Sequence, residues 1–190
     1  HITFINFKLR HICVFSILKL MKSKKNLVLL GMMGSGKSTI GKLIAKKLNF
    51  KFLDIDHVIE NQTKMKILEI FDKKGEPFFR NLEEKTTLKF LNLSNCVISL
   101  GGGAYANENI QKQTLLKSKT FWLNWDHLTL INRIKKNKKR PIASALNENE
   151  LKNLIIKRTK YYSKAMYKID CNELTKTQIV KKIFELYEKN

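Results

Sequence analysis

Apolar and polar positions along the chain alternate between two periods, which indicates short strands separated by helices. The run NLVLLG at 26–31 is continuously apolar and ends in glycine, a pattern typical of a buried strand. The next segment, 36–48, carries its apolar residues at the spacing of one helix face, at Ile40, Leu43, Ile44 and Leu48. A buried strand that leads directly into an amphipathic helix is the repeating unit of a parallel sheet.

The same alternation continues to the end of the chain. Further strands are predicted at 50–56, 96–100, 120–125 and 167–170. Further helices are predicted at 126–136, 150–165 and 175–189, and two helices at 66–91 that are broken near Gly75 and Pro77. Thr175 and Gln178 have the spacing of a capping box at the start of the last helix. The pattern therefore predicts an α/β fold, with a parallel sheet covered by helices on both faces.

Length and composition favour one domain. The chain has 190 residues, of which 43% are hydrophobic, enough to bury a substantial core. Residues 1–20 stand apart, because they are apolar and basic, hold no acid and contain no apolar run long enough to cross a membrane. They begin with His and are followed by Met21, which favours translation upstream of the true start over a targeting segment. We therefore expect 1–20 to be an extension outside the fold and 21–190 to form a single domain.

The formal net charge of +21 raises the question of a nucleic-acid partner. The excess comes from 32 lysines against five arginines, and the lysines are spread along the whole chain instead of forming one stripe. This distribution disfavours a dedicated nucleic-acid role and leaves a basic surface that attracts anionic small molecules. Cys13, Cys96 and Cys171 form no CxxC pair, which disfavours a disulfide framework and favours a cytoplasmic location.

The segment GMMGSGKST at 31–39 carries the clearest chemistry. It matches G-x-x-x-x-G-K-[ST], follows a predicted strand and opens a predicted helix, as a phosphate-binding P-loop requires. Its glycines allow backbone N–H groups to surround a polyphosphate at a helix N-terminus. Lys37 can reach the β- and γ-phosphates, and the Ser38 hydroxyl can bind Mg²⁺. The sequence therefore predicts a nucleoside triphosphate site.

Acids and glycines at two other predicted strand ends extend this site. Asp54 and Asp56 are two residues apart at the end of the second strand, so alternation would direct both carboxylates into the ligand crevice. The triplet Gly101–Gly103 follows a buried strand directly, where glycines let a ligand approach the backbone.

The five arginines are informative because the chain uses lysine almost everywhere else. They are Arg10, Arg80, Arg133, Arg140 and Arg158. Arginine is favoured where a planar fork must hold a carboxylate or phosphate, or where a flat group must stack. An exposed salt bridge is the structural alternative for any one of them.

Taken together, these residues resemble the shikimate kinase family. The matching stretches are GMMGSGKSTIGKLIAKKL, FLDIDHVIE, GEPFFRNLEE, VISLGGGA, KKRPI and KRTKYYSKA, in family order. The resemblance implies a five-stranded parallel sheet flanked by helices, with a mobile lid and a substrate-binding helical segment. It implies phosphorylation of the 3-hydroxyl of shikimate by ATP, with Mg²⁺ as cofactor. It gives no oligomeric state, and we expect a monomer with no membrane partner.

The resemblance also implies a role for each matched residue. ATP would be bound by Gly34, Ser35, Gly36, Lys37, Ser38 and Thr39, with Arg133 covering the adenine and Arg140 descending on the phosphates. Ser38 would hold Mg²⁺ directly, and Asp54 would hold it through water. Asp56 would bind shikimate hydroxyls and accept the proton of the attacking one. Arg80 and Arg158 would clamp the carboxylate, and Gly102, between Gly101 and Gly103, would meet the substrate through its backbone.

Two positions depart from the family pattern. Lys160 stands where the family often has Pro, and Lys164 stands near the place of a frequent Glu, so the local helix geometry is expected to differ from the family's.

Three other functions remain open. From chemistry alone, a gluconate kinase would satisfy the same residues, since gluconate is also a carboxylate-bearing polyol. A nucleotide kinase and a nucleic-acid or nucleotide binder without turnover are the other two alternatives.

Overall fold

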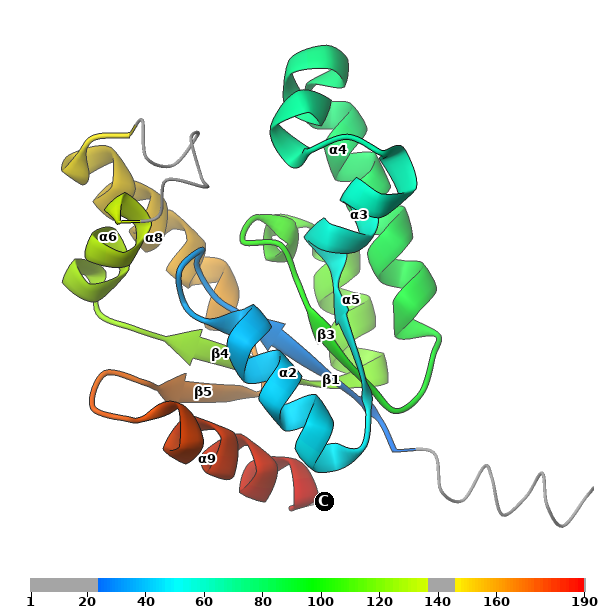
Figure 1. Cartoon of the computed structure of the whole chain (residues 1–190), viewed down its shortest axis with the longest axis vertical. Coiled ribbons are helices and arrows are strands. Elements are labelled where there is room, and N and C mark those ends of the chain that lie inside the picture. The colour runs from blue at the N-terminus through cyan, green and yellow to red at the C-terminus, as the bar shows by residue number, and fades with distance from the viewer. Residues whose placement is uncertain (1–23, 137–145, 190) are drawn as a thin grey trace, which may run out of the picture.

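The computed structural model describes residues 24–136 and 146–189 (Figure 1). Five strands form one sheet in the order β2-β3-β1-β4-β5. They are β1 (Asn26–Leu30), β2 (Lys51–Asp54), β3 (Cys96–Ser99), β4 (Ser118–Asn124) and β5 (Tyr167–Asp170). All neighbouring strands are parallel, so their carboxyl ends meet at one edge of the sheet. The expected α/β fold with five parallel strands is confirmed.

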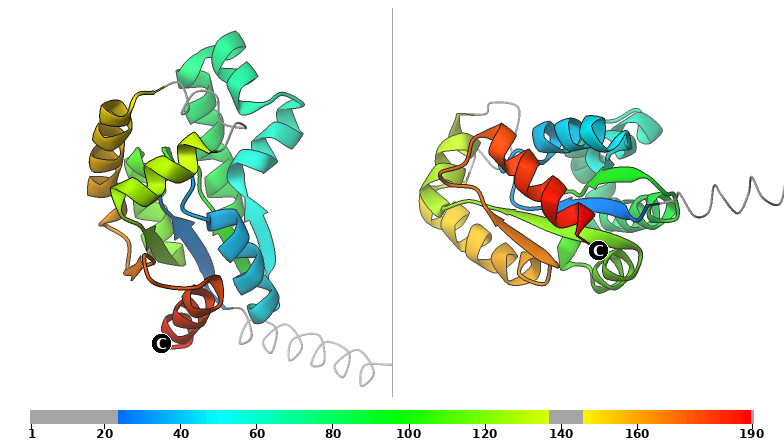
Figure 2. Two further views of the ribbon diagram at one scale, coloured as in Figure 1. Left: turned by 60° about the vertical axis from the view of Figure 1, so that its left-hand side comes forward. Right: turned by 90° about the horizontal axis from the view of Figure 1, so that it is seen from below.

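Helices cover both faces of this sheet, as Figure 2 shows. They are α2 (Lys37–Leu48), α3 (Ile55–Thr63), α4 (Ile67–Leu91), α5 (Glu108–Lys117), α6 (His127–Lys135), α8 (Glu148–Tyr162) and α9 (Lys176–Glu188). A short 3₁₀ turn, η1 (Ala104–Ala106), follows the glycine triplet. Among these described helices none is long and apolar enough to span a membrane.

The first strand divides the core into two halves. Leu27 and Leu29 pack in the cluster formed with α2 and α9, whereas Val28 and Leu30 pack in the cluster formed with α4, α6 and α8. All four side chains are at most 1% exposed, because a central strand of a parallel sheet is buried on both faces. This accounts for the continuous apolar run in the sequence.

The chain crosses from one side of β1 to the other between β3 and β4. Strands β2 and β3 lie on one side of β1, and β4 and β5 lie on the other. Such a reversal leaves a crevice outside the carboxyl ends of the central strands, where ligands of open α/β sheets bind. In Figure 1, α3 and the start of α4 stand above this edge on one side, and α6 and α8 stand above it on the other.

Several predicted elements are confirmed and one is wrong. The helices expected at 126–136, 150–165 and 175–189 are α6, α8 and α9, and the Thr175–Gln178 capping box closes with Gln178 N donating to Thr175 Oγ1 at 3.3 Å. The break expected near Gly75 is present as a kink inside α4, where Gly75 has φ 81° and ψ 165°. The second strand, however, ends at Asp54 and not at residue 56, and helices α3 and α5 were not predicted. The proposed extension, residues 1–20, lies outside the described residues.

Candidate active site

The P-loop joins β1 to α2 through a backbone conformation that favours glycine. Gly34 and Gly36 have φ values of 81° and 89°, in the left-handed region that other residues enter only at a cost. This conformation brings the loop's N–H groups together at the N-terminus of α2, where the helix dipole attracts an anion. The Lys37 ammonium donates to the carbonyl oxygens of Gly31, at 2.7 Å, and Met32, at 3.2 Å, and so lies along the loop.

A hydroxyl and a carboxylate meet beside this loop. Ser38 Oγ, in the first turn of α2, donates to Asp54 Oδ2 at 2.6 Å, at the end of β2. Both are hard oxygen ligands of the kind that Mg²⁺ prefers. Among the described residues there is no group of three or more His, Cys, Asp or Glu that could hold a metal.

Asp56 lies at the cavity as expected, but the expected cause, alternation of side chains along a strand, is wrong. Asp56 is in the first turn of α3, because the chain leaves the sheet after Asp54 and the fully buried Ile55 begins the helix. An acid is favourable in the first turn of a helix, where the dipole is positive. The carboxylate nevertheless lines the same cavity as Asp54, because α3 starts at the carboxyl edge of the sheet.

The glycine triplet makes room for charged side chains from three helices. A Cβ at Gly101 would lie 2.6 Å from Asp56 Oδ1 and 2.5 Å from Glu83 Oε1. A Cβ at Gly103 would lie 2.7 Å from the nearer terminal nitrogen of Arg80, and one at Gly102 would lie 3.0 Å from Arg158 Nη1. A larger residue at any of these positions would therefore displace at least one of the charged groups.

Arg80 is held by two carboxylates of its own helix, α4. Its Nη1 donates to Glu83 Oε2 at 2.7 Å, and its Nε and Nη2 donate to Glu76 Oε1 at 3.1 and 3.0 Å. Burial alone would lower the pKa of Arg80, but the carboxylates of Glu83 and Glu76 outweigh it, so the pKa is raised. For Glu83, burial raises the pKa, and the opposing attraction of Arg80 does not fully offset it. The Arg80 guanidinium is therefore held in place and charged. The Glu83 carboxylate, in contrast, is destabilised by burial, and its attraction to Arg80 offsets only part of this effect.

Arg158, on α8, lies beside a methionine sulfur and a tyrosine. Its Nη1 lies 3.5 Å from the sulfur of Met32, and Tyr162, one turn further along α8, donates from its hydroxyl to the carbonyl of Gly102. Burial is the main cause that raises the pKa of Tyr162, so the phenol stays protonated as a donor. Arg158 thus adds a second guanidinium to the site from the opposite side of the sheet edge.

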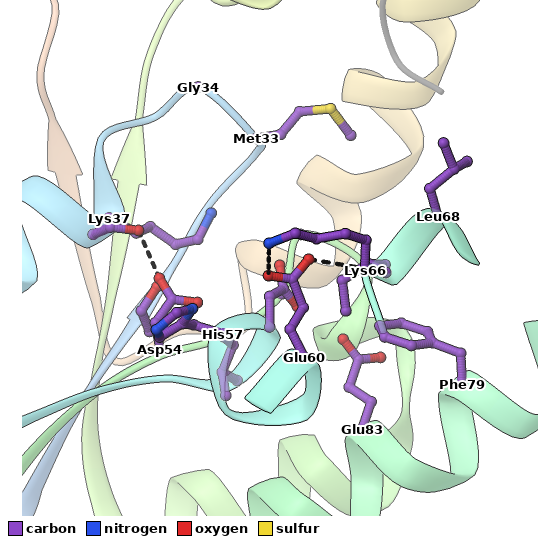
Figure 3. A pocket seen from close by; sticks show the side chains of 18 of the residues that line it. Met33, Gly34, Lys37, Asp54, His57, Glu60, Lys66, Leu68, Phe79 and Glu83 are labelled. Carbon is purple, nitrogen blue, oxygen red and sulfur yellow. Dashed lines mark hydrogen bonds and ion pairs between the residues drawn. The ribbon is translucent and has the colours of Figure 1, made fainter. Parts of the chain in front are cut away.

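One cavity of about 1100 Å³ is lined by residues of the P-loop, the glycine triplet, both arginines and the acids Asp54, Asp56 and Glu83 (Figure 3). Of the residues expected at the site, those that line it are Gly34, Gly36, Lys37, Ser38, Thr39, Asp54, Asp56, Arg80, Gly101, Gly102, Gly103 and Arg158. Ser35 is 1% exposed and its carbonyl accepts a hydrogen bond of 2.9 Å from the Trp125 indole. Arg133 lies outside the cavity, with its guanidinium 3.7 Å over the Trp125 ring. Arg140 is outside the described residues.

The comparisons with known proteins agree with this geometry. The sequence profile described as shikimate kinase matches residues 33–188. A curated shikimate kinase of Sulfurihydrogenibium is 41% identical over 159 residues, which are 84% of this chain and 95% of that protein. The chain belongs to the shikimate kinase family. The reaction is therefore the ATP-dependent phosphorylation of shikimate.

Solved structures of family members and of more distant kinases share the fold. The structure of shikimate kinase from Acinetobacter baumannii in complex with shikimate has a TM-score of 0.83, with 30% identity, and covers 90% of this chain and 97% of that one. A gluconokinase from Sinorhizobium meliloti has a TM-score of 0.57 with 11% identity, covering 87% of this chain and 92% of that one. The second likeness shows only the fold, so the gluconate alternative is less supported.

Sequence reasoning missed several residues of the site in this shikimate kinase family member. Glu83 was visible in the F-R-x-x-E pattern, and its i+3 spacing from Arg80 on a helix predicts one shared face. Trp125 and Tyr162 gave no such signal, because their contacts join segments far apart in the sequence. The two departures from the family pattern are harmless to local geometry: α8 continues through Lys160 to Tyr162, and Lys164 Nζ donates to Gln111 Oε1 at 2.9 Å.

Proposed function

We propose that the protein phosphorylates the 3-hydroxyl of shikimate in this cavity, and that the site residues have the following roles. The P-loop, from Gly34 to Thr39, binds the triphosphate of ATP. Arg80 and Arg158 bind the shikimate carboxylate, and the backbone of Gly101–Gly103 lies against the ring. Asp56 binds the attacking hydroxyl and accepts its proton. Arg133 covers the adenine, and Arg140 stabilises the transferring phosphoryl group.

A single observation carries the assignment. Lys37 and Ser38 line the same cavity as the two guanidinium groups, with the Asp56 carboxylate also exposed to it. Phosphoryl transfer needs a polyphosphate and a hydroxyl acceptor in line, and little covalent help from the protein. A P-loop opposite a pair of carboxylate-binding forks, with a proton acceptor in the same space, meets this need.

The oxygen pair of Ser38 and Asp54 fits Mg²⁺. Ser38 would bind the ion directly and Asp54 through water, with ATP phosphates completing the ligands. When bound, Mg²⁺ neutralises charge on the phosphates. The 2.6 Å hydrogen bond between the two side chains supports this role, because it holds the two oxygens next to each other beside the P-loop.

A parallel assay of ADP release with shikimate, gluconate and CMP tests the proposal. We expect turnover with shikimate alone, and its loss in Lys37→Ala. Faster turnover with gluconate or CMP would overturn the substrate assignment. A salt titration against DNA tests the last alternative, since tight salt-sensitive binding without turnover would identify a nucleic-acid binder. We further propose that the protein acts as a monomer in the cytoplasm and that residues 1–20 contribute nothing to this site.

A further inference from the structure

Lys66 occupies a position that its own helix does not favour. It is the N-cap of α4, where Ser, Thr, Asp and Asn are preferred because their side chains accept a backbone hydrogen bond. A lysine ammonium has no acceptor, and the positive end of the helix dipole repels it. A residue that conflicts with its local structure without a structural gain is a candidate for a functional one.

The start of α4 is held without the Lys66 side chain. Glu69 Oε2 accepts the backbone N–H of Lys66 at 2.8 Å, and Glu60 Oε1 on α3 accepts the N–H of Ile67 at 3.2 Å. These two carboxylates satisfy the first donors of the helix. Helix formation therefore does not explain a lysine at position 66.

The Lys66 side chain extends into the cavity. In Figure 3 it runs from the start of α4 toward the P-loop, so that its ammonium and that of Lys37 point into the same space from opposite sides. Its ion pair is with Glu60 Oε2, at 3.3 Å, and the Lys66 side chain is 77% exposed. An exposed pair of this kind contributes about 0–1 kcal/mol, so the ammonium exchanges readily to a stronger anion. Glu60 keeps the Ile67 N–H as a partner when Lys66 leaves.

Two other cations of the cavity have hydrogen-bond partners within the protein. Lys37 donates to carbonyls of the P-loop, and Arg80 is bound by two glutamates near the expected carboxylate site. Lys66 lines the same cavity as the P-loop and both arginines, and in Figure 3 its side chain extends from the start of α4 toward Lys37. In the proposed reaction the phosphoryl group passes from ATP to shikimate within this cavity.

We propose that Lys66 is a further phosphate-binding residue, whose ammonium leaves Glu60 and pairs with the transferred phosphoryl group, most strongly once that group is an ester of the product. This rests on the function proposed above. The flexible four-carbon stem suits a group that follows the phosphoryl as it moves. Lys66 would then raise the affinity for the phosphorylated product without raising the affinity for shikimate.

The test uses the full chain and compares Lys66→Ser with Lys73→Ser. Lys73 lies further along α4, pairs with Glu69 at 3.7 Å and does not line the cavity, so its variant controls for loss of charge on this helix. Serine at 66 also supplies a favoured N-cap, so Lys66→Ser should melt no lower than the wild type. Equilibrium titrations with shikimate 3-phosphate and with shikimate, without nucleotide, provide the readout.

We expect Lys66→Ser to bind shikimate 3-phosphate about tenfold more weakly, with shikimate affinity changed less than twofold and Lys73→Ser unchanged for both. Lys66→Arg, which keeps the charge, should retain most of the product affinity. Unchanged product affinity in Lys66→Ser, or an equal loss for both ligands, would overturn the proposal while the wild type still binds shikimate. A wild-type protein that binds neither ligand would instead overturn the proposed function, and this inference with it.

Discussion

The cavity has two walls that hold their ligands by different means. The P-loop wall offers mainly backbone N–H groups at the N-terminus of α2, shaped by the left-handed glycines Gly34 and Gly36. The substrate wall offers the side chains of Arg80, Glu83 and Asp56 from α3 and α4, which lie so close to the glycine triplet that an added Cβ would displace them. A backbone site depends on local conformation, whereas a side-chain site depends on which helices meet.

Among the substitutions that compare the two walls, the largest effect is expected at Asp56, which faces the reaction from the substrate wall. Asp56→Asn keeps the shape but removes the proton acceptor, and general-base groups contribute about 10²–10⁴-fold. Because phosphoryl transfer is loose, we expect the low end, a fall in kcat of about 10²-fold. Steady-state kinetics would measure it, with Asp72→Asn as a control on the exposed part of α4 outside the cavity. Near-normal turnover in Asp56→Asn would show that the hydroxyl is activated elsewhere.

Alanine at one glycine of each wall separates the two modes directly. At Gly36 a Cβ meets no protein atom within 4 Å, so within the protein Gly36→Ala acts through its φ of 89°, a strain of about 1–2 kcal/mol. At Gly103, where φ is −102°, the backbone accepts alanine, but the Cβ displaces the Arg80 guanidinium. We expect Gly36→Ala to raise KM for ATP and Gly103→Ala to raise KM for shikimate, each about tenfold.

Each of these variants is the control for the other. Their kinetics with both substrates give four KM values, and the comparison predicts that two change and two do not. If Gly103→Ala raised KM for ATP as much as KM for shikimate, the two walls would not bind their ligands independently, and the distinction between a backbone site and a side-chain site would be wrong.

The same substitution, arginine to lysine, can be made on the substrate side and on the P-loop side of the site. Arg158→Lys keeps the charge but loses the planar fork, so KM for shikimate should rise about tenfold, equivalent to about 1.4 kcal/mol, with KM for ATP little changed. Arg133→Lys should show the reverse preference, because Arg133 stacks on Trp125 and donates to Gly34 O at 3.5 Å on the P-loop side. Equal changes for both substrates in either variant would refute these assignments.

The same contrast explains how far the sequence could be interpreted. The P-loop was predictable because a contiguous motif between a strand and a helix fixes its own backbone. The sheet was predictable because its buried strands are continuous apolar runs. Asp56 was assigned to the right cavity on the wrong element, since alternation within FLDID cannot reveal that a helix begins at Ile55. The Arg133–Trp125 stack and the Tyr162–Gly102 hydrogen bond depend on tertiary packing, for which the sequence carries no local pattern.

The smallest effect concerns the stability of the substrate wall as a function of pH. Burial is the main cause that raises the pKa of Glu83 above its ordinary value of 4.5, so the folded protein holds this proton more tightly than the unfolded chain. The stabilisation is complete below 4.5 and is lost as the pH rises through the raised pKa. Glu83→Gln cannot ionise and keeps an acceptor for Arg80, so its melting temperature should rise relative to the wild type between pH 4 and pH 8.

Asp126 provides a control with the opposite sign. It is the N-cap of α6, and hydrogen bonds from Thr129 are the main cause that lowers its pKa. Its contribution is present at neutral pH and is lost as the pH falls through the lowered pKa, so Asp126→Asn should lose stability relative to the wild type as the pH rises from 3 to 7. Melting curves of both variants across pH 3–8 should therefore diverge in opposite directions. If the melting temperatures of Glu83→Gln and the wild type changed in parallel with pH, Arg80 would fully compensate the burial of the Glu83 carboxylate, and the side-chain wall would carry no cost in stability that the backbone wall avoids.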